Sequence, residues 1–327
     1  MKIVIYCSSF APAIGGMEKL NETLAAEFTA MGHEVHVITE TPGSLPLPYP
    51  VTRGPSFGKF LAIARWADVI LSAPLSLKRY LPIALARRPV FFSMPDRLGG
   101  AGLQRITALL KRFLAGRHGV IVPSRYMATH FANARVITNP YDDKVFRLPD
   151  TSEPRHGFVF VGRFVEWKGV QILIEAFTNV ADQLPGHDLT LIGAGPEEPR
   201  LRLLSQSLGI GDRVHFAGVE KGTALAESIG RHAVMVVPSI GAEPFGIVAL
   251  EGLACGCRLV VSQVGGLPEA VGPHAVLAEG GDMASLAGGL VEAIRLGPPK
   301  CSEIEEYLTG FAPRRVAGSY LAAFAAG

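Results

Sequence analysis

The stretch that decides the fold covers residues 238–269 and reads PSIGAEPFGIVALEGLACGCRLVVSQVGGLPE. The apolar run Val234–Val237 precedes it, and a second apolar run, 259–261, lies inside it. This order predicts a strand, a loop bearing Glu243, a helix bearing Glu251, a strand and a Gly-Gly turn. Ligands of α/β proteins bind outside the carboxyl ends of parallel strands, so we expect both acids to face a ligand.

Composition favours a two-domain globular protein. The chain has 327 residues, of which 48% are hydrophobic and 18% are charged, so two cores are easily built. A net charge of +2 gives no argument for nucleic acid as a partner. Residues 1–5, MKIVI, are a short apolar run without the cleavage pattern of a signal peptide, so they predict a first strand. No apolar run reaches the roughly 18 residues of a membrane-spanning helix.

The four cysteines do not form a metal-binding pattern. Cys255 and Cys257 lie too close for the usual zinc pair, and no second pair accompanies them. We therefore expect reduced, buried thiols in a cytoplasmic protein.

A unit of strand, glycine loop, helix and strand occurs twice. In the first copy, strand 2–7 leads to a glycine loop, a helix from Met17 and strand 35–38. Residues 41–55, which follow this copy, are rich in Pro and Gly and predict a loop. The second copy begins at strand Phe158–Val161, after the polar segment 148–157, which is the best linker. These units predict two Rossmann-like doubly wound domains that face each other across a cleft. The expected domains are 1–150 and 151–305, followed by a terminal segment, 306–327.

Two pairs of residues suit phosphate groups. Gly15 and Gly16 stand at a predicted helix start, where backbone N–H groups bind anions. The full dinucleotide fingerprint is missing, so NAD is not favoured as the ligand. The alternative is a tight turn that binds no ligand. Arg163 and Lys168 follow a strand end and together suit a diphosphate, the alternative being ordinary surface cations.

Basic residues also gather on two predicted helices of the first half. Lys78, Arg79, Arg87 and Arg88 fall on the first, predicted for residues 77–88, and Lys111 and Arg112 fall on the next. Such residues suit an anionic membrane surface or a lipid-phosphate acceptor, and solvated helix faces are the alternative.

With these residues in view, the chain resembles the retaining group-4 (GT4) glycosyltransferases of the GT-B fold, which use nucleotide-sugar donors. The resemblance covers nearly the whole chain, including residues 311–324, which are similar to the family's last helix that crosses back onto the first domain. The matching motifs are GGME at 15–18, VGR at 161–163 with KG at 168–169, GAGP at 193–196, HFAG at 215–218, PS at 238–239 leading into EPFGIVALE at 243–251, and GGLPE at 265–269.

The resemblance implies roles for several of the matched residues. Arg163 and Lys168 would bind the donor diphosphate, Glu251 the ribose hydroxyls and Glu243 the transferred sugar. The remaining donor-binding positions would be Gly15 and Gly16 from the first domain, Gly162 and Gly195, and the amides of Phe245, Gly246 and Ile247.

The resemblance also implies the reaction. The sugar would keep its anomeric configuration through front-face attack, with the leaving phosphate taking the acceptor proton. No Asp-x-Asp motif is present, so we expect a metal-independent enzyme without a cofactor beyond its nucleotide-sugar substrate. The expected setting is cell-envelope or polysaccharide biosynthesis in the cytoplasm, at the inner face of the membrane, with a glycan, lipid-linked or small-molecule acceptor and no nucleic acid.

One motif departs from the family pattern. Family members often place a histidine on the loop after the strand at 90–92, whereas this loop reads SMPDR and contains none. We expect Asp96 or Ser93 to take over contacts to the sugar or acceptor. Two alternatives to a transferase remain: a nucleotide-sugar-binding protein that has lost catalysis, and a nucleotide-sugar 2-epimerase.

Overall fold

The structure, a computed structural model, describes residues 1–13, 15–94, 103–148 and 154–326, with side chains 103–105 excepted. The chain forms two compact units. Met1–Pro140 and Pro313–Gly327 make the first unit, and Tyr141–Ala312 makes the second. No described helix combines the length and the apolar character needed to cross a bilayer.

The first unit contains a parallel sheet, in the order β3-β2-β1-β4-β5-β6-β7 within the described residues. Its strands are β1 (Lys2–Cys7), β2 (Glu34–Thr39), β3 (Val51–Arg53), β4 (Val69–Ser72), β5 (Val90–Ser93), β6 (Gly119–Val122) and β7 (Ala134–Val136). The helices of this unit are α1 (Gly16–Ala30), α2 (Phe57–Trp66), α3 (Leu77–Ala86), α4 (Leu103–Ala115), α5 (Arg125–Ala128) and α13 (Pro313–Ala325).

The second unit repeats this plan with the described order β10-β9-β8-β11-β12-β13, again parallel. Its strands are β8 (Phe158–Val161), β9 (Leu189–Ile192), β10 (Val214–Gly218), β11 (Val234–Val237), β12 (Arg258–Ser262) and β13 (Ala275–Ala278). Its helices are α6 (Val170–Val180), α7 (Glu198–Ser207), α8 (Gly222–Gly230), α9 (Ile247–Ala254), α10 (Leu267–Val271), α11 (Met283–Leu296) and α12 (Cys301–Leu308). These two sheets confirm the predicted doubly wound α/β class.

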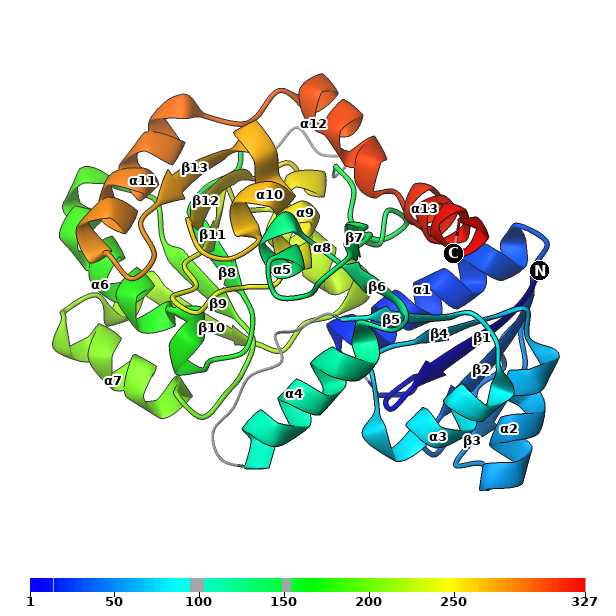
Figure 1. The fold of residues 1–327 in the computed structure, drawn as a ribbon. Helices are drawn as coiled ribbons and strands as arrows, with labels where there is room; N and C mark the ends of the chain where they lie inside the picture. The colour runs from blue at the N-terminus through cyan, green and yellow to red at the C-terminus, as the bar shows by residue number, and fades with distance from the viewer. Residues whose placement is uncertain (14, 95–102, 149–153, 327) are drawn as a thin grey trace. The chain divides into compact units, whose positions relative to one another are not determined.

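Each sheet is buried on both faces, as its nearly unbroken apolar strands require. In the first unit, α1 and α13 cover one face, where Phe28 and Phe91 both contact the Phe324 ring. The other face carries α2, α3 and α4. Figure 1 shows α13, in red, beside α1 at the end of the chain, so the final helix does belong to the first unit.

The limits of the units differ from the residues suggested by sequence, 150 and 305. Phe146, Ile304 and Leu308 all lie in the hydrophobic core of the second unit. Buried apolar side chains therefore set the limits of the units at residues 140 and 312. The polar segment 148–157 does not mark the boundary between the units. The loop predicted for residues 41–55 was wrong in part, because it contains the short edge strand β3.

Candidate functional site

The predicted donor-binding residues of the second unit gather where its strand order reverses. The reversal lies between β8 and β11, because the chain builds outward from β8 to β10 and then returns to add β11 on the other side. Arg163 and Lys168 follow β8, and Glu243 follows β11. A doubly wound sheet opens a crevice at the carboxyl ends of such strands, which is the expected place for a ligand.

Lys168 and Glu243 meet across this reversal. The Lys168 ammonium donates to Glu243 Oε1 and forms an ion pair with it. The same oxygen accepts a hydrogen bond of 2.9 Å from Ser239 Oγ. Both charged side chains are largely buried, with 17% and 9% of their surface exposed. The pair therefore holds the two loops together and presents one cation and one acid at the same point.

Arg163 has a different environment from Lys168. Its side chain is exposed and makes no hydrogen bond or ion pair with any residue that the structure describes. A guanidinium offers five donors in a planar fork that matches phosphate oxygens. Arg163 is thus a cation available to an anionic ligand, on the same loop as Lys168.

Glu251 lies in the second half of α9 and is a half-buried residue. Burial raises its pKa to about 7, and the neighbouring Asp142 carboxylate raises it further. Its side chain has no hydrogen-bond partner within the described residues. A carboxylate without an internal partner is able to accept hydrogen bonds from a pair of ligand hydroxyl groups.

The start of α9 supplies backbone amides. Gly246 takes the left-handed conformation (φ 102°) and the helix begins at Ile247, while the Phe245 ring is buried beside Phe311. The first N–H groups of a helix have no intrahelical acceptor and lie at the positive end of its dipole. The amides at 246 and 247 can therefore receive an anion, and the Phe245 side chain anchors the turn instead of facing a ligand.

Close backbone approach explains the glycines of these loops. Gly169 has φ 71°, and a Cβ there would collide with the carbonyl oxygen of Pro238. Gly265 likewise has no room for a side chain, because the backbone of Glu243 lies against it. The glycines 162, 193 and 195 belong to a similar contact, in which the loop after β9 lies against the loop after β8. Gly162 and Gly195 thus shape the site through backbone packing.

The predicted residues of the first unit are placed less completely. Gly15 and Gly16 form the start of α1, with Gly15 in an extended conformation. Asp96 lies outside the described residues. Ser93 is buried, and its Oγ lies 3.5 Å from the Tyr320 hydroxyl, so the suggestion that it contacts a sugar was wrong. The last helix covers it.

Three residues around the site were missed in the sequence. Ser239 orients Glu243, Asp142 affects Glu251, and the Trp167 carbonyl accepts hydrogen bonds from the amides of residues 240 and 241. The Lys168 ammonium lies 4.4 Å from the centre of the Trp167 ring. A serine four residues before Glu243 was a usable signal, whereas the influence of Asp142 required the fold.

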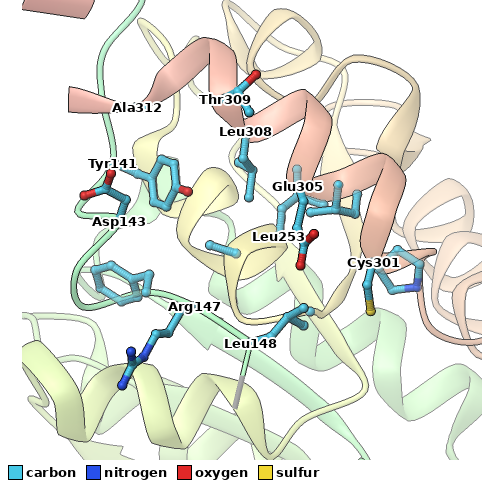
Figure 2. Close-up of a pocket in the computed structure, with 15 residues that line it drawn as sticks. Tyr141, Asp143, Arg147, Leu148, Leu253, Cys301, Glu305, Leu308, Thr309 and Ala312 are labelled. Carbon is cyan, nitrogen blue, oxygen red and sulfur yellow. The ribbon is translucent and has the colours of Figure 1, made fainter. Parts of the chain in front are cut away.

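A separate cavity of about 400 Å³ opens at the far end of α9. Its lining is mainly apolar, and Figure 2 shows Tyr141 and Leu308 beside it, with Glu305 on α12. None of Arg163, Lys168, Glu243 and Glu251 lines it. The loops after β8 and β11, and not this cavity, form the candidate site.

Comparison with known proteins supports the resemblance. Residues 146–309 match the family model described as glycosyl transferases group 1. The match covers half of the chain, so the chain belongs to this glycosyltransferase family, within the group-4 enzymes of the GT-B fold. The match includes the whole candidate site of the second unit.

Curated relatives and solved structures agree with this assignment. The chain is 35% identical over 176 residues to D-inositol 3-phosphate glycosyltransferase of Acidothermus cellulolyticus, covering 48% of the chain and 39% of that relative. It is 26% identical to N-acetyl-alpha-D-glucosaminyl L-malate synthase of Bacillus anthracis, covering 90% and 88%. The crystal structure of Anabaena HepE in complex with UDP and glucose has the same fold, with a TM-score of 0.81 at 21% identity over the whole of both chains.

Proposed function

We propose that the protein is a retaining, metal-independent glycosyltransferase that moves a sugar from a nucleoside-diphosphate sugar to an acceptor hydroxyl. The observation that carries this proposal is the meeting of Lys168 and Glu243 where the strand order of the second sheet reverses. The exposed Arg163 follows the same strand as Lys168, the first amides of α9 follow the loop that carries Glu243, and Glu251 lies on that helix. Together they match the parts of a sugar nucleotide: diphosphate, sugar and ribose.

Each group has a defined task in this proposal. Arg163 and Lys168 bind the diphosphate, whose negative charge rises as the bond from sugar C1 to phosphate oxygen breaks. The amides at 246 and 247 hold a phosphate or sugar oxygen. Glu243 accepts hydrogen bonds from the sugar, and Glu251 from the ribose.

The chemical step balances without a protein nucleophile. The acceptor oxygen forms its bond to C1 on the face from which the diphosphate departs, so the configuration is retained. The acceptor proton passes to the leaving phosphate oxygen. The protein contributes position and positive charge, which are the two largest sources of rate in such transfers.

Several parts of the proposal rest on the family alone. Gly15 and Gly16 would contact the donor from the first unit, and Asp96 would replace the usual histidine. Two relatives named above carry small-molecule acceptors in their names, inositol 3-phosphate and malate, and the family resemblance adds glycan and lipid-linked acceptors. We also propose a cytoplasmic location with peripheral contact to the inner face of a membrane.

Donor turnover tests the proposal. UDP, GDP and ADP sugars are incubated with the protein, and free nucleotide and sugar products are measured with EDTA present and absent. Nucleotide release that EDTA leaves intact supports the proposal. If EDTA abolishes nucleotide release and a divalent ion restores it, the enzyme is not metal-independent. Nucleotide-sugar binding without nucleotide release would favour a binding protein. A sugar product inverted at C2 would favour an epimerase.

A further inference from the structure

Trp167 is a large aromatic residue that the hydrophobic cores of the second unit do not use. In the part of this unit that the structure describes, its side chain belongs to neither core cluster, and 37% of the residue is exposed. Globular proteins usually bury most of a tryptophan, because its ring contributes more apolar area than other side chains do. Core packing alone therefore does not explain a tryptophan beside the ion pair.

The backbone fixes Trp167 against the loop after β11. Trp167 is the middle residue of a short 3-10 helix, Glu166–Lys168. Its carbonyl oxygen accepts hydrogen bonds from the amides of Ile240 and Gly241, at 2.9 and 3.1 Å. Gly241 also packs against the side chain, since a Cβ at this position would lie 3.0 Å from Trp167 Cβ and 3.4 Å from its ring atom Cε3. Both loops therefore contribute to the position of the ring.

The Lys168 ammonium lies over this ring. Its Nζ atom is 4.4 Å from the ring centre and at the same time forms the ion pair with Glu243. Consecutive residues of a 3-10 helix project about 120° apart, so the ammonium reaches the ring because the flexible four-carbon stem of the lysine folds back. The negative face of an indole attracts a cation at this distance. Two partners of different kinds, a carboxylate and an aromatic face, thus hold the ammonium.

These two partners differ in what they do to an incoming diphosphate. The Glu243 carboxylate occupies an N–H group of Lys168 and repels phosphate oxygens, because both carry negative charge. The Trp167 ring has no net charge and attracts the ammonium through its face, so N–H groups that point away from the ring stay available to phosphate oxygens. The ammonium can therefore exchange the carboxylate for a phosphate without leaving the ring.

We infer that Trp167 is a positioning residue for Lys168: its ring keeps the ammonium where the two loops meet while the ammonium changes partner from Glu243 to the donor diphosphate. This inference rests on the proposed function, because it adds a residue to the diphosphate site. The ring contacts the ammonium and none of the reacting atoms. Without the ring, the lysine side chain gains rotational freedom, and a ligand has to order it on binding, which weakens the affinity.

A double-mutant cycle tests the inference directly. Calorimetry measures the affinities of UDP, GDP and ADP for the wild type, Trp167→Leu, Lys168→Met and the double variant, each as the full chain. Trp167→Leu should weaken binding of the preferred nucleotide about fivefold, the size of one cation–π contact, and should have no effect when Lys168 is Met. An equal loss in both backgrounds would show that the ring acts by packing alone and would overturn the inference. Unchanged or tighter binding by Trp167→Leu would also overturn it.

A conservative variant separates the aromatic face from the bulk of the side chain. Trp167→Phe keeps a ring, so it should bind the nucleotide within about twofold of the wild type, and both variants keep the carbonyl that Ile240 and Gly241 contact. Leu296 is another exposed apolar residue of this unit, at the end of α11, and Leu296→Ala is a matched control that should bind as the wild type does. Equal losses in Trp167→Phe and Trp167→Leu, or in Trp167→Leu and Leu296→Ala, would overturn the inference.

The same titrations distinguish failure of this inference from failure of the proposed function. Thermal unfolding first confirms that each variant is folded. If the wild type binds a nucleotide, Lys168→Met weakens that binding and Trp167→Leu does not, the inference fails and the diphosphate site remains. If the wild type binds none of UDP, GDP and ADP, the proposed function fails and the inference fails with it. The expected result is a loss in Trp167→Leu that requires Lys168 and that Trp167→Phe largely avoids.

Discussion

The Lys168 ammonium and the Glu243 carboxylate form an ion pair that joins the loop after β8 to the loop after β11. The pair satisfies both charges within the second unit. In the proposed function, a diphosphate would compete with Glu243 for Lys168, and a sugar hydroxyl would compete with Lys168 for Glu243. Donor binding would thus exchange one internal ion pair for contacts to two parts of one ligand.

Glu243→Gln tests this exchange. The amide still accepts the Ser239 hydrogen bond, but Lys168 becomes free, so a nucleoside diphosphate without sugar should bind equally well or up to about tenfold more tightly. Turnover of the sugar donor should fall about 100-fold, because a contact that strengthens in the transition state is lost. Titration calorimetry and steady-state kinetics measure the two effects. Weaker diphosphate binding in this variant would show that Glu243 mainly positions Lys168.

The ribose role of Glu251 can be tested with a deoxy ligand. Wild-type protein should prefer the ribonucleoside diphosphate over its 2′-deoxy form by about tenfold, the value of one hydrogen bond to a charged group. Glu251→Gln should reduce this preference, and Glu227→Gln, an exposed site in the same unit, should retain it. An unchanged preference in Glu251→Gln would assign the ribose to another residue.

The raised pKa of Glu251 predicts a pH dependence of stability. Its folded-state pKa of about 7 lies above the ordinary value of 4.5, so the folded protein holds this proton more tightly than the unfolded chain. The resulting stabilisation is fully present below pH 4.5 and is lost as the pH rises through 7. Its full size is about 3.5 kcal/mol, at about 1.4 kcal/mol per pKa unit.

Urea unfolding of Glu251→Gln at several pH values checks this dependence. Relative to wild type, the variant should gain about 2–3 kcal/mol between pH 4.5 and pH 8, because its amide stays neutral. Parallel pH profiles for the two proteins would mean that the carboxyl group titrates normally in the folded state.

Gly169 should be indispensable for the shape of the site. Gly169→Ala meets both a left-handed backbone and the Pro238 carbonyl, so it should lower the free energy of unfolding by more than about 2 kcal/mol. Gly186 has a similar φ of 76° but open space around it, and Gly186→Ala should cost only about 1 kcal/mol. Equal losses would show that the Pro238 contact can relax.

The sequence predicted the second unit better than the first. Its strands are continuous apolar runs followed by glycines and charged residues, so β8 and β11 were located to the residue. The edge strand β3 has three half-buried residues in a Pro-rich segment, and this weak local signal was read as loop. The local sequence pattern identifies central strands because these are completely buried and therefore apolar. It does not identify edge strands that are only half-buried.

The candidate site could be predicted in its members but not in its pairing. The spacing of Glu243 and Glu251 and the motif around Arg163 pointed to a donor site. The ion pair from Lys168 to Glu243 connects residues 75 positions apart, and its formation depends on the neighbouring placement of β8 and β11. The raised pKa of Glu251 likewise depends on burial by the fold.

In the proposed function, the loops after β8 and β11 bind the diphosphate of a sugar nucleotide. The most direct measurement is calorimetric titration of UDP, GDP and ADP into the wild type and into Arg163→Ala/Lys168→Ala, with a thermal-unfolding check on both. We predict that one nucleotide binds the wild type and binds the folded double variant at least about 100-fold more weakly, since two charge-assisted contacts are lost. Equal affinity for both proteins would contradict diphosphate binding by Arg163 and Lys168.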